Sequence, residues 1–173
     1  MAIHLFDSQS MSLKKMLVGH ERTITCLVWH PHDPNQVAVS HLDGMIIIWN
    51  IEKEEPCFKY HIGETGGCCE QLDWSPTRPT DLYYATRDHH DGEAYVLDTA
   101  NGPVSNATTR LHKREKNTSV KVMRCHPTVT GRSVIGLSDG RLVLFENRNA
   151  SKKLVFNQPK KNPNTVAIED VQW

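Results

Sequence analysis

Residues 19–50 read GHERTITCLVWHPHDPNQVAVSHLDGMIIIWN, and this stretch decides the fold. It contains three apolar runs, at 24–28, 37–39 and 46–49, separated by His30-Pro31 and by Asp43-Gly44. Short apolar runs between turn-forming residues are typical of β-strands. Gly44 can adopt the positive φ that a tight turn requires. The stretch therefore predicts three short strands joined by turns.

Two landmarks of this stretch recur along the chain. The Asp-Gly pairs at 43–44, 91–92 and 139–140 are each followed, six residues after the Asp, by a bulky residue: Trp49, Leu97 or Phe145. Upstream of each pair, a predicted strand ends just before Pro31, Pro76 or Pro127. A proline fits there because the end of a strand needs no donor for the ladder. The coincidence of these landmarks in three copies indicates an internal repeat.

Composition narrows the class of protein. Strand-like runs dominate, and no long segment has the apolar period of a helix, so we expect an all-β protein. The 173 residues carry 20 basic and 20 acidic side chains, without the basic excess typical of nucleic-acid-binding proteins. The N-terminus lacks the features of a signal peptide, and no apolar run reaches transmembrane length. We therefore expect a cytoplasmic protein, with nuclear or ciliary locations as alternatives, rather than a secreted or membrane protein.

The stretch is similar to one blade of the WD40-repeat family. Gly19-His20 near its start and Trp49-Asn50 at its end match that family's signature, which repeats every 40–45 residues or so. The chain resembles this family from about Ile3 to Trp173. The resemblance implies an all-β WD40 β-propeller of four-stranded blades, and it implies an interaction scaffold without enzymatic activity.

The resemblance also implies a structural hydrogen-bond network in each blade. In WD40 blades the Asp of the turn accepts a hydrogen bond from the His, and a Ser or Thr bridges the His and the Trp. A buried indole N–H also needs a partner. The expected network residues are His20, Ser40, Asp43, Trp49, Asp91 and Asp139.

Three tryptophans recur at the end of the first strand of a predicted blade: Trp29, Trp74 and Trp173. Tryptophan is enriched among interface anchors, which gives one interpretation. Recurrence at a single blade position favours the other, that they pack in the core between blades.

The two ends of the chain read as parts of blades. We expect the last two strands of a preceding blade at 1–18, complete blades at 19–60, 61–109 and 110–158, and a linker with a further first strand at 159–173. The predicted architecture is an incomplete propeller or a fragment, with exposed blade edges that could drive self-association. The alternative is a compact four-bladed propeller in which 166–173 pairs with the N-terminal strands.

A basic run lies where the second predicted blade meets the third. It contains Arg110, His112, Lys113, Arg114 and Lys116. Basic side chains on a loop can attract acidic partners, so the run is a possible partner-binding loop. This gives an alternative function, a reader of an acidic peptide or a nucleic acid. A solvated loop without a partner is the competing interpretation.

Motifs for catalysis, phosphate binding or metal binding are not found in the sequence. It contains no Gly-x-Ser-x-Gly elbow and no phosphate-binding loop. Cys68 and Cys69 are adjacent and would point to opposite faces of a strand, which does not suit a shared zinc ion. We expect no catalytic residues, no cofactor and no metal. Other proteins are the expected partners, in a multi-subunit complex or within a longer polypeptide, rather than nucleic acid or membrane.

Overall fold

The computed structural model describes residues 1–63, 67–88, 91–101, 108–146, 153–156, 168 and 170–172. Within these ranges the chain forms β-strands and one short 3₁₀-helix, η1 (Thr99–Asn101). The strands are β1 (Ala2–Phe6), β2 (Leu13–Val18), β3 (Ile24–Trp29), β4 (Gln36–His41), β5 (Met45–Asn50), β6 (Glu55–His61), β7 (Cys68–Trp74), β8 (Asp81–Asp88), β9 (Asp91–Asp98), β10 (Thr108–His112), β11 (Val120–Cys125), β12 (Ser133–Leu137), β13 (Leu142–Phe145) and β14 (Lys153–Phe156).

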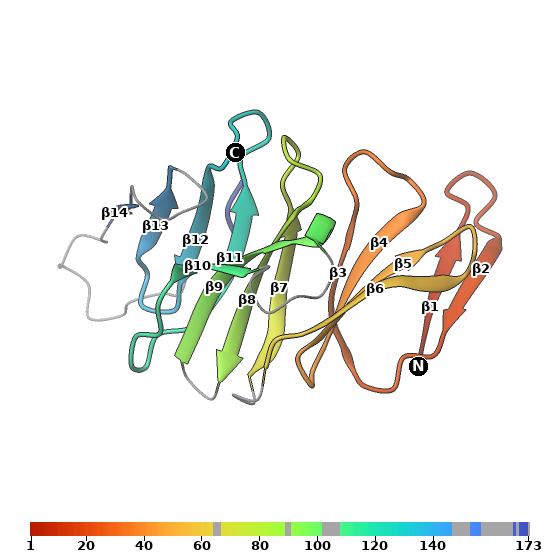
Figure 1. Ribbon diagram of the computed structural model, residues 1–173, viewed down its shortest axis with the longest axis horizontal. Coiled ribbons are helices and arrows are strands. Elements are labelled where there is room, and N and C mark those ends of the chain that lie inside the picture. Colours follow the sequence, from red (N-terminus) through yellow and green to blue (C-terminus); the bar gives the residue numbers. More distant parts are fainter. Residues whose placement is uncertain are drawn as a thin grey trace.

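The described strands form one two-stranded sheet, β1-β2, and three four-stranded antiparallel sheets. The four-stranded sheets have the orders β3-β4-β5-β6, β7-β8-β9-β10 and β11-β12-β13-β14. The sheets follow one another in chain order along the molecule, from β1 and β2 at one end to β13 and β14 at the other (Figure 1). The prediction of an all-β arc with three four-stranded blades is confirmed. We call these sheets the first, second and third blades.

The registers place the bulky landmark residues at equivalent positions. Trp49, Leu97 and Phe145 pair with Val37, Leu82 and Ser133 respectively on the neighbouring strand. On the other side, the same three partners pair with Trp29, Trp74 and Cys125. Positions in the three blades can therefore be compared residue by residue.

The second blade differs from the others in its central hairpin. Twelve residues separate Val37 from Trp49, whereas fifteen separate Leu82 from Leu97. The additional residues extend β8 and β9, which are joined through residues 89–90, outside the described residues. Asp91 pairs with Asp88 inside the ladder. The prediction that Asp91 begins a turn like that of Asp43 is therefore wrong.

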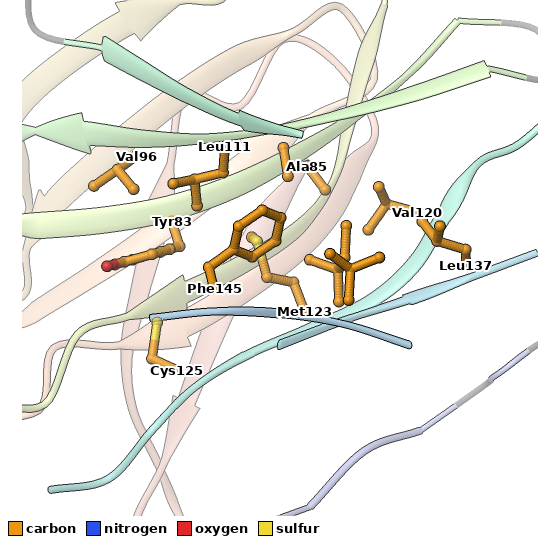
Figure 2. Packing of buried hydrophobic residues seen from close by; sticks show 12 residues of the cluster. Tyr83, Ala85, Val96, Leu111, Val120, Met123, Cys125, Leu137 and Phe145 are labelled. Atoms are coloured by element: carbon orange, nitrogen blue, oxygen red, sulfur yellow. The ribbon is translucent and has the colours of Figure 1, made fainter. Parts of the chain in front are cut away.

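Each junction between neighbouring sheets contains an apolar core. The core between the β1-β2 sheet and the first blade contains Ile3, Leu17, Val37, Val39, Ile47, Trp49 and Ile51. A second core joins the first and second blades, and a third joins the second and third. In the third core, Tyr83 and Leu111 of the second blade lie with Met123 and Phe145 of the third (Figure 2). The burial of these side chains holds each sheet to the next one along the chain.

The residue before each landmark proline caps the turn that follows the first strand of its blade. Nδ1 of His30 accepts the backbone N–H groups of residues 32 and 33, at 3.2 and 2.9 Å. His126 accepts the N–H groups of residues 128 and 129 in the same way. Ser75 Oγ accepts the N–H of Arg78 at 3.2 Å. The predicted turn at these prolines is therefore present in all three blades.

The C-terminal segment lies against the third blade. Residues 166–173 were predicted to form the first strand of a further blade. Only 168 and 170–172 of them are described, and these are not in a strand. Trp173 lies outside the described residues. The Ile168 N–H donates to Leu137 O at 3.4 Å. A Cβ on Gly136 would lie 2.7 Å from Ile168 Cγ2. Because Ile168 contacts β12, the alternative in which this segment pairs with the N-terminal strands does not hold at this residue.

Candidate functional site

Of the network predicted in the first blade, only His20 and Trp49 lie together, with His41 as a third member. The imidazole Nδ1 of His20 lies 3.0 Å from Nε2 of His41, and both residues are buried. The His20 ring also packs on Trp49, with ring centroids 5.0 Å apart. His41 occupies the place expected for Ser40, between His20 and the strand that carries Trp49. The structure therefore forms a His20–His41–Trp49 cluster.

The hydrogen bonds of this cluster fix the tautomers of both histidines. Nδ1 of His41 lies 3.1 Å from the carbonyl oxygen of Met45, which can only accept, so this nitrogen carries the proton. Nε2 of His41 then accepts the hydrogen bond from Nδ1–H of His20. The remaining Nε2 of His20 and the indole Nε1 of Trp49 are buried without a hydrogen-bond partner in the described residues. The expectation that the indole finds a partner is wrong.

The protonation of His20 is disfavoured by its surroundings. Burial lowers the pKa of His20, and the neighbouring His41 and the N-terminal ammonium lower it further. The His20 ring is therefore neutral near pH 7. This arrangement holds a loop against the sheet but provides no group poised for proton transfer.

Asp43 and Ser40 make other contacts than the predicted ones. Asp43 lies in the turn, where its Oδ1 accepts the N–H of Met45 at 3.2 Å, and it does not bond to His20. Ser40 Oγ bonds to Thr25 Oγ1 at 2.9 Å, and Thr25 Oγ1 in turn donates to the carbonyl oxygen of Cys69 in the second blade. Ser40 therefore helps to join two blades instead of bridging His20 and Trp49.

Of the other two predicted network residues, Asp139 belongs to a charged cluster at the second and third blades, and Asp91 does not. Asp139 lies in a turn like that of Asp43, and its Oδ2 is 2.7 Å from Nε of Arg141. Arg141 also pairs with Glu115, which lies 4.0 Å from buried His112. Asp91 is separate from this chain of contacts. Its Oδ1 accepts the N–H of residue 117 at 2.8 Å.

The basic run is not a free basic surface. Arg110 and His112 lie in β10, so the boundary predicted between 109 and 110 falls inside a strand of the second blade. The guanidinium of Arg110 is 3.6 Å from Glu93. That of Arg114 is 2.6 Å from Asp88. Only Lys113 and Lys116 remain as exposed basic residues of the run with no ion pair among the described residues.

A small hollow lies beside the His20–His41–Trp49 cluster. Its volume is about 140 Å³, and its lining residues are Gly19, Glu21, Arg22, His41, Asp43, Met45, Ile47 and Lys59. Arg22 and Asp43 approach each other to 4.0 Å across an exposed part of this wall. His41, one of these lining residues, already bonds to His20 and to the carbonyl oxygen of Met45.

The largest departure from the predicted packing is at Trp29. This residue is 53% exposed, and Leu27 on the same strand is 43% exposed. The equivalent residues of the other two blades are buried: Leu72 1%, Trp74 3%, Met123 0% and Cys125 6%. The prediction of a core position holds for Trp74 and is wrong for Trp29. The reason is that the β1-β2 sheet has only two strands and leaves this part of β3 uncovered.

Apolar exposure continues on the β1-β2 sheet. Its exposed side chains include Phe6 at 59%, Leu13 at 53%, Met16 at 46% and Val18 at 57%. Single exposed apolar residues are common on protein surfaces, but several on one small sheet are a feature of interaction sites. The N-terminal end of the arc is therefore the candidate functional site of the described chain.

Three further features of the described residues bear on other kinds of site. No three His, Cys, Asp or Glu side chains are grouped so as to hold a metal ion. Within the same ranges, no helix has the length and hydropathy needed to cross a bilayer. All five cysteines are free thiols.

Comparisons with known proteins agree with the fold. Residues 11–50 match the family described as WD domain, G-beta repeat. The chain is 38% identical over 69 residues to DNA damage-binding protein 2 of Gallus gallus, covering 39% of this chain and 13% of that protein. It is 33% identical over 60 residues to Polyadenylation factor subunit 2 of Schizosaccharomyces pombe, covering 33% and 12%. It is 25% identical over 100 residues to Protein transport protein SEC31 of Candida glabrata, covering 58% and 8%.

These matches span 13% or less of each relative's length. The structure shows three four-stranded sheets of one design, with an apolar core at each junction between them. The chain is therefore similar to the WD40-repeat family over residues 11–50, and its repeated four-stranded sheets agree with that similarity.

Proposed function

We propose that the chain is a non-catalytic protein–protein interaction scaffold, a part of a WD40 β-propeller that helps to assemble a larger complex. The observation that carries this proposal is the uncovered apolar end of the arc around Leu27 and Trp29. Aromatic side chains with large exposed area are frequent anchors of protein interfaces. A scaffold also needs rigid support, and the apolar junctions between the sheets provide it.

The placement of the polar residues supports a non-catalytic role. His20 and His41 bond to each other, His41 also bonds to the Met45 carbonyl oxygen, and the half-buried carboxylate of Asp73 accepts the N–H of Cys125 across a blade junction at 2.6 Å. These groups are committed to holding neighbouring segments together. A catalytic pair would instead need a titratable group directed at a substrate-sized opening.

The alternative reader function receives little support from the structure. Both arginines of the basic run are neutralised by Glu93 and Asp88, so an acidic ligand would have to displace ion pairs already present. The chain as a whole has zero formal charge. We therefore assign the partners to proteins rather than to nucleic acid or membrane, and we propose a cytoplasmic location.

Within the family, we infer a resemblance to the N-terminal propeller of WD repeat-containing protein 17. It rests on residues 21–25 before Trp29, on the turn at 32–34, on 47–50 and on 136–140. A comparison of the complete sequences, scored at these positions against other family members, tests this inference.

Affinity purification of the tagged chain, with mass spectrometry of the recovered proteins, tests the scaffold function. We expect at least one protein in stoichiometric amount that remains bound after a wash at high salt, because apolar contacts resist screening. Recovery of no stoichiometric partner under conditions where the chain is folded would contradict a scaffold role. Measured turnover of a small molecule by the purified chain would contradict its non-catalytic assignment.

A further inference from the structure

The turn that follows the first strand is closed by the same backbone hydrogen bonds in all three blades. In the first blade, the His30 N–H donates to Gln36 O at 3.0 Å, and the Gln36 N–H donates to Asp33 O at 3.1 Å. The turns of the other two blades close in the same way, over residues 75–81 and 126–132. The first two blades differ in the group that caps the turn, which is an imidazole in the first and a serine hydroxyl in the second.

Both ring nitrogens of His30 are engaged. Nδ1 lies 3.2 and 2.9 Å from the backbone nitrogens of His32 and Asp33, which can only donate. Nε2 lies 3.0 Å from the carbonyl oxygen of Pro79 in the second blade, which can only accept, so Nε2 carries the proton. These contacts fit the neutral Nε2–H form of His30. A second proton has only Nδ1 to bind, and there it would face two N–H donors.

The titratable groups on the same turn are His32 and Asp33. The His32 ring lies with its centroid 6.4 Å from that of His30. The Asp33 carboxylate accepts the N–H of Asn35 at 2.9 Å and the side-chain amide of Gln36 at 2.8 Å. To accept a new N–H from an imidazolium at close range, this carboxylate would have to shift away from these donors, which themselves shape the turn.

The charged groups on the elements packed against this turn are paired with each other. In the second blade, the guanidinium of Arg78 lies 3.3 Å from the buried carboxylate of Asp81. The segment between β5 and β6, which donates a backbone hydrogen bond to the turn, carries Lys53 and Glu55 at 4.0 Å from each other. The remaining neighbour is the indole of Trp74, whose ring centroid lies 4.7 Å from that of the imidazole in an edge-to-face arrangement.

We propose that the turn at residues 30–36 is an acid-sensitive switch, closed while His30 is neutral and open once its Nδ1 takes a proton. Histidine is the side chain that changes charge between about pH 5 and 8. Protonation converts Nδ1 from an acceptor into a donor, so both capping bonds break and the ring turns away from the two N–H groups. Closure is therefore complete at high pH and is lost as pH falls. Residues 31, 32, 34 and 35 are exposed, so opening changes the surface of the first blade. This device goes beyond the scaffold function and does not require it.

His32 is not the trigger, although it lies in the same turn. Its Nε2 lies 2.5 Å from the carbonyl oxygen of Pro76 in the second blade, so it donates there. An Nε2–H donates in the neutral and in the protonated imidazole alike. Protonation of His32 therefore keeps its bond to the second blade, whereas protonation of His30 removes the two bonds that cap the turn.

The second blade provides a reference turn without a titrating cap. Ser75 Oγ accepts the N–H of Arg78 at 3.2 Å, at the same separation of three residues as from His30 to Asp33. A serine hydroxyl keeps its acceptor lone pairs throughout this pH range. The turn of the second blade should therefore stay capped when that of the first blade opens.

A nuclear magnetic resonance titration of the 173-residue chain from about pH 8 to about pH 5.5 tests the proposal. The imidazole nitrogen shifts report the protonation of His30. Amide exchange at residues 32 and 33, relative to an unstructured peptide at the same pH, reports the capping bonds. We expect protection at these two amides to fall by about tenfold or more, with the same midpoint as the protonation of His30. Protection at the Arg78 amide should not change.

Three variants identify the responsible group. His30→Ser replaces the imidazole by the cap of the second blade and should keep the amide of residue 33 protected at both ends of the pH range. His32→Gln and His4→Gln, the latter at an exposed histidine of β1, should leave the response of the unmodified chain intact. Melting temperatures at about pH 8 check that each variant is folded.

Several outcomes would overturn the switch. These are a His30 that stays neutral to about pH 5.5, a protonated His30 with residues 32 and 33 still protected, and a response that survives in His30→Ser or disappears in His32→Gln. If His30→Ser does not fold, the comparison of residues 32 and 33 with residue 78 in the unmodified chain decides the question.

Discussion

The His20–His41 hydrogen bond can be tested by replacing His41 with alanine. The loss leaves Nδ1–H of His20 buried without a partner, and such a group costs about 1–3 kcal/mol. The ring of His41 is itself buried, so its removal also leaves a cavity, and we place the expected loss in free energy of unfolding at about 2–3 kcal/mol. For a chain of this size, that corresponds to a fall in melting temperature of about 4–12 °C.

Asp43→Ala is the matched control for this experiment. If Asp43 held His20, as the family resemblance implies, this substitution would be as damaging as His41→Ala. In the structure the Asp43 side chain is 40% exposed and meets Arg22 only at 4.0 Å. Its removal also breaks the exposed hydrogen bond from the Met45 N–H, and it should therefore lower the free energy of unfolding by no more than about 1 kcal/mol. Urea unfolding of both variants measures the difference, and equal losses would refute the assignment of His41 as the partner.

Three further predictions concern pH, backbone and thiols. The pKa of His20 is lowered in the folded state, so the stability that neutral His20 contributes is fully present above its unfolded pKa of about 6.5 and is lost as pH falls through the folded pKa. The melting temperature of the unmodified chain should therefore fall on acidification, and that of His20→Gln should fall less steeply. Gly44→Ala should lower the free energy of unfolding by at least about 1 kcal/mol more than Gly63→Ala. Both glycines have positive φ, but only at Gly44 would a Cβ meet other atoms, Ile62 Cγ1 at 2.7 Å and Gly67 O at 2.9 Å. Equal losses in urea unfolding of the two variants would contradict this. Iodoacetamide should modify exposed Cys57 in the native chain and leave buried Cys69 and Cys125 unmodified until denaturant is added, as mass spectrometry of the peptides can measure.

The repeat could be predicted because its landmarks are set by local chemistry. Proline at the end of a first strand, an Asp-Gly turn and a bulky residue six positions later each reflect constraints within one hairpin. Where the hairpin keeps its length, as in the first and third blades, Gly44 and Gly140 adopt the same φ of 82°. Where the hairpin is longer, the Asp91-Gly92 pair moves into the ladder, although its spacing from Leu97 is unchanged.

The sequence-based prediction of Ser40 as the partner of His20 used residue type and not the direction of side chains along the strand. Side chains alternate along a strand, so the residues that share a face with Val37 and Val39 are at odd positions. His41 is one of these, whereas Ser40 points with Ala38 toward the second blade. The sequence therefore contained the signal. Applying the alternation rule to β4 would have selected His41 over the hydroxyl residue.

The charges of the basic run could not be judged from the run itself. Its arginines are paired with Asp88 and Glu93, which lie on β8 and β9, more than fifteen residues earlier in the chain. A run of basic residues attracts acidic partners only if no acidic side chain from another part of the chain pairs with it. Here the hairpin that precedes β10 brings the compensating carboxylates, and the resulting exposed pairs contribute little to stability or to binding.

The contrast between Trp29 and Trp74 connects the repeat to its function. The two residues have the same position in their blades and pair with equivalent neighbours, yet their exposed fractions are 53% and 3%. The burial of a repeat residue is therefore a property of two adjacent blades and not of one. A residue at this position is exposed wherever the preceding sheet lacks a covering strand, and the proposed scaffold function uses this exposure for binding. Trp74 buries its indole between two blades of this chain, and Trp29 exposes the same apolar surface, which a partner could bury.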